Sequence, residues 1–158
     1  GGRDNTMTNN MFVHCDRAFS IDARGLGWAK DVGEFATKEL IALGYKQPPW
    51  SVRYPELLNI LEDEPLAPKG NVVARSICLG GKWGSTEPKA LPYVTIKDNL
   101  LDTDPHLKDI AHDRFELQDD SPAFKLGFRR IPFEKIGLYP SADRAAIELS
   151  HSLPGHAR

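Results

Sequence analysis

Residues 1–25 read GGRDNTMTNNMFVHCDRAFSIDARG and contain two short runs rich in β-forming residues, 6–15 and 18–23. An apolar run, Met11-Phe12-Val13, follows the pair Asn9-Asn10. Such a run is too short for a helix and is typical of a buried strand. This stretch therefore predicts short strands that are joined by polar corners.

The same pattern returns twice further along the chain. Residues 70–79 (GNVVARSICL) align with residues 4–13 without a gap, and residues 93–101 (YVTIKDNLL) align with residues 4–12. Asn10, Ser76 and Asn99 then share one repeat position. Repeats of this kind indicate stacked units that are too thin to bury a core alone. The recurring polar residue predicts a ladder of side chains at a corner, each bonded to turn backbone.

A different periodicity lies between the first two repeats. Apolar residues along 31–43 fall on one face of a helix, and a second short helix is predicted for 55–63. Residues 26–69 are therefore predicted to form a helical insertion. No low-complexity linker divides the chain, so we expect one domain over residues 1–139 and a C-terminal tail over 140–158.

Composition excludes several classes of partner. The chain has 158 residues and a net charge of −2, which gives no electrostatic basis for binding nucleic acid or an anionic membrane. No apolar run approaches the roughly 20 residues of a membrane span. The five histidines show no recognised metal spacing, so no metal and no cofactor are expected. Two cysteines leave open whether they are buried thiols or a disulfide.

Six motifs carry a resemblance to a known family, and they span residues 1–139: GGRDNTMTNNMFVHC, FSIDARGLGWAK, QPPWSVRYPELLNIL, GNVVARSICLGGKW, FELQDDSPAFKLGF and PFEKIGLY. In this order they resemble the C-terminal coils of right-handed parallel β-helix proteins that act on polysaccharides, such as family 141 of the glycoside hydrolases. The resemblance implies an all-β fold, a right-handed parallel β-helix of about three to four coils with the helical insertion. It also implies a carbohydrate-active protein that is secreted or periplasmic.

The resemblance bears on catalysis as well. Glycoside hydrolysis needs two carboxyl groups that flank the scissile bond. The related hydrolases carry an acidic pair one coil before the Gly-Gly-Arg-Asp-Asn motif. The resemblance therefore implies that this chain corresponds to a C-terminal portion, with one catalytic carboxylate pair upstream.

Two carboxylates of the chain are candidate catalytic groups. Asp4 follows Arg3, and Asp22 precedes Arg24 by two positions. An arginine beside a carboxylate keeps it ionised, which suits a nucleophile or base. The alternative is structural: Asp4 serves a turn, and Asp22 pairs with Arg24 only to hold the backbone.

Four residues are candidate substrate-binding groups: Arg3, Arg24, Trp28 and Arg53. Trp28 follows a Gly-Leu-Gly turn, and the face of its indole can stack on a sugar ring. Trp50 and Trp83 are weaker candidates of the same type. The alternative for each tryptophan is packing of the insertion against the strands.

Three functions are compatible with these residues. The first is a glycoside hydrolase-like protein that hydrolyses or binds an oligo- or polysaccharide. The second is a polysaccharide lyase, and the third is a non-catalytic glycan-binding piece or a truncated β-helix. Because open strand stacks pair with other chains unless they are covered, the first coil is expected to be covered by a second copy of the chain, by the insertion 26–69 or by an upstream segment. In the first case the protein is a homodimer whose contact includes Met7, Met11 or Phe19. Residues 128–139 are predicted to cover the other end.

Overall fold

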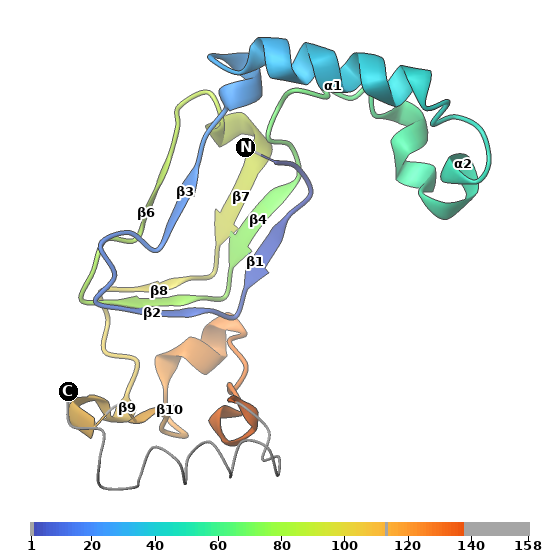
Figure 1. Ribbon diagram of the computed structural model, residues 1–158. Coiled ribbons are helices and arrows are strands. Elements are labelled where there is room, and N and C mark those ends of the chain that lie inside the picture. The colour runs from blue at the N-terminus through green and yellow to red at the C-terminus, as the bar shows by residue number, and fades with distance from the viewer. Residues whose placement is uncertain (1, 113, 138–158) are drawn as a thin grey trace, which may run out of the picture.

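The computed structural model describes residues 2–112 and 114–137 (Figure 1). Its strands are short because polar residues and turns interrupt each apolar run: β1 (Thr6–Thr8), β2 (Met11–Val13), β3 (Phe19–Ile21), β4 (Asn71–Ala74), β5 (Ile77–Leu79), β6 (Gly84–Thr86), β7 (Val94–Lys97), β8 (Leu100–Leu101), β9 (Leu107–Asp109) and β10 (Arg114–Leu117). The α-helices are α1 (Lys30–Ala42) and α2 (Trp50–Arg53). Short 3₁₀ turns complete the structure at Arg24–Leu26, Pro55–Asn59, Leu91–Tyr93, Ile110–His112, Pro122–Leu126 and Phe133–Lys135.

The strands from the three repeats pair in parallel. The sheet orders are β1-β4-β7, β2-β5-β8 and β3-β6. Met11 lies opposite Ile77, which in turn lies opposite Leu100. The gapless alignment of the repeats is therefore confirmed residue by residue. We call the strands that one repeat contributes a layer: β1 to β3 form the first layer, β4 to β6 the second, and β7 and β8 the last.

The predicted ladder of corner residues is also present. The backbone N–H of Asn10 donates to the hydroxyl oxygen of Ser76 at 3.2 Å. The backbone N–H of Ser76 donates to the side-chain oxygen of Asn99 at 2.9 Å. Each corner side chain thus accepts a hydrogen bond from the layer before it. These bonds fix the register of the layers at a place where the strand hydrogen bonds are interrupted.

The expectation of an all-β, right-handed parallel β-helix of three to four coils is wrong. The described residues form small parallel sheets, one antiparallel pair (β9 with β10) and several helices, which is a mixed α/β structure and not a clear solenoid. The physical reason lies after β8. The polar segment 102–106 offers no apolar strand to a further parallel layer, and the chain turns into the antiparallel pair instead.

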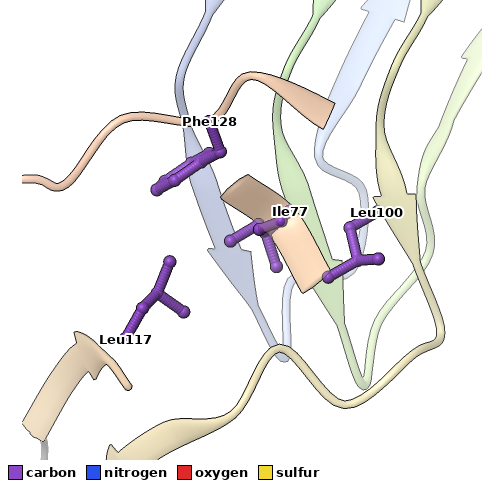
Figure 2. Packing of buried hydrophobic residues seen from close by; sticks show 5 residues of the cluster. Ile77, Leu100, Leu117 and Phe128 are labelled. Carbon is purple, nitrogen blue, oxygen red and sulfur yellow. The ribbon is translucent and has the colours of Figure 1, made fainter. Parts of the chain in front are cut away.

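The core lies between the β2-β5-β8 sheet and the C-terminal segment (Figure 2). Ile77 is 1% exposed and packs in a buried cluster that is completed by Leu100, Leu117, Ala123 and Phe128. Met11 and Ile131 pack against this cluster. Phe128 and Ile131 therefore belong to the core that the sheet forms with the C-terminal segment. The predicted C-terminal tail, 140–158, lies outside the described residues.

The helical segment stands apart from this core (Figure 1). α1 agrees closely with the helix predicted for 31–43, but it contains no buried residue. Its apolar side chains line one wall of a cavity of about 310 Å³. The other wall includes Ile60, Leu61, Pro65 and Leu66. The helix predicted for 55–63 is in fact a 3₁₀ turn over Pro55–Asn59 that follows the four-residue α2. Gly25 and Gly33 allow Leu66 to approach, because a Cβ on either would collide with it.

Candidate functional site

Asp22 and Arg24 form a bidentate ion pair directly after β3. The Arg24 NH2 group lies 2.6 Å from Asp22 Oδ2, and Arg24 Nε lies 2.9 Å from Asp22 Oδ1. The same Oδ1 accepts from the backbone N–H of Arg24 at 3.2 Å, which closes a tight turn. The Asp22 side chain is 31% exposed, so solvent and solutes reach it. The end of β3 and this turn together hold the Asp22 carboxylate in one orientation.

This ion pair sets the charge state of Asp22. Hydrogen bonding from the Arg24 guanidinium holds the pKa of the Asp22 carboxyl well below its usual range. The carboxylate in turn raises the pKa of Arg24. Asp22 is therefore ionised at neutral pH and can accept hydrogen bonds, attack or take up a proton, but it cannot serve as a proton donor.

Trp28 lies beside the pair and is the most exposed of the large apolar side chains described, at 77%. The guanidinium carbon of Arg24 lies 5.5 Å from the centre of the indole ring, within the range of a cation–π contact. The structure thus brings together three of the residues selected from the sequence. We call Asp22, Arg24 and Trp28 the Trp28 cluster.

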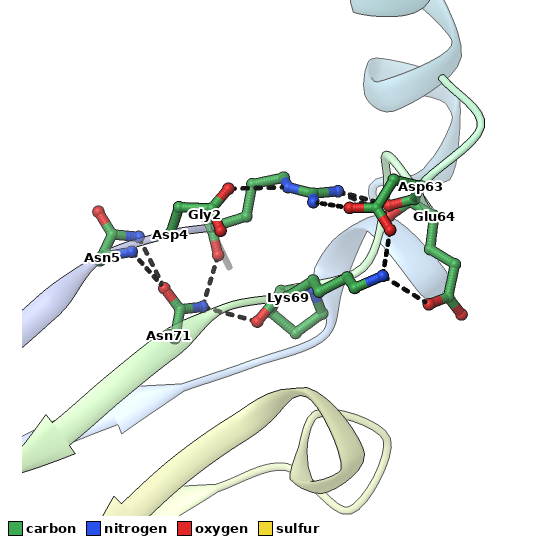
Figure 3. Close-up of polar contacts among 9 residues, drawn as sticks. Gly2, Asp4, Asn5, Asp63, Glu64, Lys69 and Asn71 are labelled. Atoms are coloured by element: carbon green, nitrogen blue, oxygen red, sulfur yellow. Dashed lines mark hydrogen bonds and ion pairs between the residues drawn. The ribbon is translucent and has the colours of Figure 1, made fainter. Parts of the chain in front are cut away.

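Asp4 lies in a different setting, where the first layer meets the end of the helical segment (Figure 3), and Arg3 bonds to it there. Arg3 donates to the carbonyl oxygen of Asp63 at 2.7 Å and to its carboxylate at 2.6 Å. Lys69 pairs with the same carboxylate. The Arg3 side chain is only 17% exposed. Its contacts tie residues that are sixty positions apart, so Arg3 serves as a structural clamp here.

Asp4 accepts a hydrogen bond from Arg3 Nε at 3.1 Å, and its carboxylate is well exposed. Its backbone is in the left-handed region, with φ at 58°. Asp4 lines a hollow of about 580 Å³ together with carboxylates of the helical segment, among them Glu56, Glu62 and Asp63. Arg24, by contrast, lines the cavity beneath α1. Asp4 and Arg24 therefore line different cavities.

Arg53 lies at the end of α2, and its guanidinium carbon is 5.7 Å from the ring centre of Tyr54. Tyr54 also stacks on Trp50, with ring centres 6.4 Å apart and planes 19° from parallel. This stacked pair was missed as a unit in the sequence, although a spacing of four residues places side chains on one helical face. Trp83 packs edge-on against Phe19 with ring centres 4.8 Å apart and is half-buried, which agrees with the packing alternative for this tryptophan.

A metal site and a disulfide also have no basis in the described part of the chain. No group of three or more His, Cys, Asp or Glu side chains in residues 2–112 and 114–137 is arranged to hold a metal ion. Cys15 and Cys78 are both free thiols, which answers the question that the sequence left open. No described helix is long and apolar enough to cross a membrane.

Comparison with known proteins gave no match: no family model, no curated protein and no solved structure is significantly similar to this chain.

Proposed function

We propose that this chain is a carbohydrate-active protein that binds an oligo- or polysaccharide at the Trp28 cluster. The observation that carries the proposal is the exposed indole of Trp28 beside a fixed ion pair of Asp22 and Arg24. A sugar ring has an apolar C–H face and a rim of hydroxyl groups. The indole offers a flat apolar surface for the face, and the ion pair offers acceptors and donors for the rim.

Arg24 keeps N–H donors available within the described residues after it pairs with Asp22. Its guanidinium carries five N–H donors, and its side chain is 51% exposed. Three N–H groups of Arg24, counting its backbone, bond to Asp22. Arg24 already lies over one side of the indole ring. The sugar would therefore stack on the opposite face and reach the ion pair across the edge of the ring.

Binding is favoured over hydrolysis by this chain alone. In the hydrolase-like activity that the family resemblance implies, the ionised Asp22 would be the nucleophile or base, and another carboxyl group would have to donate the proton. Asp4 was the second candidate, but it lines another hollow with other partners. The lyase alternative is less favoured, because Asp22 raises the pKa of Arg24 and so keeps this arginine from acting as a base.

Tryptophan fluorescence and calorimetric titration against a panel of soluble poly- and oligosaccharides test the proposal. We expect Trp28→Ala to weaken binding roughly tenfold or more, since loss of one stacking residue of this size removes about 1–3 kcal/mol. Trp50→Ala is the matched control, because Trp50 stacks on Tyr54 away from the cluster. Equal affinity of the Trp28 variant and the native chain would contradict the proposal.

Product analysis on the same panel distinguishes the three functions. A lyase makes an unsaturated sugar end that absorbs ultraviolet light, and a hydrolase makes new reducing ends without that absorption. Binding without products is the result that we expect. New reducing ends that are lost in Asp22→Asn would instead support hydrolysis with Asp22 as the nucleophile or base.

A further inference from the structure

We propose that the first layer of one copy of this chain docks on the last layer of a second copy, head to tail and in parallel register. The inference rests on the strand edges and on the corner ladder, and it is independent of the glycan proposal. It replaces the looser expectation of a dimer through the first coil with a specific pairing of residues.

Both ends of the stack present open strand edges in the described structure. β1 and β2 are edge strands at one end, and β7 and β8 are edge strands at the other. The N–H of Val72 donates to the carbonyl of Asn5, on the inner side of β1. Because alternate residues of a parallel strand bond to opposite neighbours, the backbone groups of Thr6 and Thr8 point outward. An exposed edge of this kind is a template for another strand.

The corner ladder specifies the direction of the incoming strand. Ser76 and Asn99 each accept a hydrogen bond from the backbone N–H of the corner residue one layer earlier. The side chain of Asn10 holds the same position in the first layer, and it makes no hydrogen bond within the described residues. Its oxygen is therefore placed to accept from the corner N–H of a preceding parallel layer.

The last layer of a second copy supplies that N–H and matches the rest of the edge. In the register of the repeats, Asn99 of the second copy falls opposite Asn10, and Ile96 falls opposite Met7. Leu101 falls opposite Phe12 in the same way. Met7, Ile96 and Leu101 are all large apolar side chains that are exposed in the single chain. Docking would bury them, and no like charges meet at these positions.

Such docking has a consequence for assembly. The two surfaces belong to opposite ends of the stack, so the contact is heterologous and does not close on itself after two copies. The average mass should therefore rise continuously with protein concentration and should not stop at a dimer.

Disulfide trapping tests the register. Thr6 and Thr95 lie on either side of Val72, roughly 9.6 Å apart within one copy, which is too far for a disulfide. Between docked copies they would be direct neighbours. In a background of Cys15→Ser and Cys78→Ala, we expect Thr6→Cys mixed with Thr95→Cys to form a covalent heterodimer, and neither variant alone to do so. Self-linkage of Thr6→Cys, or no linkage at all, would overturn the head-to-tail arrangement.

Sedimentation velocity of the chain with its native cysteines, under reducing conditions, gives a second test that needs no cysteine replacement. We expect Asn10→Ala to weaken self-association roughly tenfold, because the N–H of Asn99 in the neighbouring copy loses its acceptor. Asn59→Ala, an exposed asparagine of the helical segment, should associate like the native chain. A native chain that stays monomeric at all concentrations would refute the proposal.

Discussion

The strand layers and the helical segment 26–69 both contain many apolar residues, but the two regions bury them to very different degrees. Ile77 of β5 is 1% exposed, whereas Ile41 of α1 is 57% exposed. The layers are held by register-specific pairing, by corner hydrogen bonds and by a shared apolar cluster. The helical segment is held mainly at its two ends, by Gly25 against Leu66 and by the Arg3 clamp. The amphipathic pattern therefore predicts the helix α1 correctly. The same pattern does not tell whether the apolar face of the helix is buried, and no residue of α1 is buried.

The largest expected effect compares the same substitution in the two regions. Ile77→Ala removes buried methyl groups from the centre of the core cluster, and we expect a loss of about 2–5 kcal/mol in the free energy of unfolding. Ile41→Ala in α1 should change it by less than about 0.5 kcal/mol, since the side chain is already in water. Urea denaturation followed by circular dichroism measures both. Equal losses would show that α1 is packed as tightly as the layers.

The sequence predicted the layers well because their information is local and repeated. The alignment of residues 4–13 with 70–79 predicts that Met11 lies opposite Ile77, and the structure confirms this pairing. The fold class predicted from the sequence is wrong, because the helices and the β9-β10 pair make the chain mixed α/β.

The candidate site was predicted in part. Asp22, Arg24 and Trp28 are neighbours in sequence, so a short turn was enough to bring them together. Arg3 is predicted from the sequence to bind substrate, whereas in the structure it bonds to Asp63, which lies sixty positions away; no local pattern shows such a contact. Long-range contacts of this kind decide which charged residues remain free for a ligand.

The second prediction concerns the polar corner of the layers. Asn71 is buried; it accepts from the backbone N–H and the side chain of Asn5, and it donates to the carbonyl oxygens of Gly2 and Pro68 (Figure 3). Asn71→Ala leaves several of these groups unpaired, so we expect a loss of about 2 kcal/mol. Asn59→Ala is the exposed control, and thermal unfolding of the two variants measures the difference. A small effect at Asn71 would mean that water replaces its bonds.

The third prediction concerns the junction between the two regions. A Cβ at Gly25 would collide with the backbone carbonyl of Leu66, whereas a Cβ at Gly33 would meet only the tip of the Leu66 side chain. We therefore expect Gly25→Ala to cost about 1–3 kcal/mol by forcing the backbone apart. Gly33→Ala should be nearly neutral, since alanine favours the helix and the side chain can move. If Gly33→Ala were the more damaging variant, α1 would be packed more rigidly than its exposure indicates.

The smallest expected effect is the pH dependence of the Asp22–Arg24 pair. Folding lowers the pKa of Asp22, so the pair stabilises the native state above the ordinary aspartate pKa of 3.8. That contribution disappears as the pH falls through the pKa of the folded state. Asp22→Asn should therefore lower stability slightly at pH 7, and the difference from the native chain should shrink below about pH 4. Arg24→Gln removes the largest cause of the lowered Asp22 pKa and should show the same trend. A difference from the native chain that grows at low pH would contradict this explanation.

Native-state hydrogen exchange tests most directly whether the strand layers are the stable unit that carries the helical segment. The N–H groups of Ile77 and Leu100 donate across layers to Asn10 and Ser76 at 2.8 and 2.9 Å. We predict that these amides exchange only through global unfolding, whereas amides of α1 exchange through local opening at much lower free energy. Protection of the α1 amides equal to that of Ile77 would contradict this account.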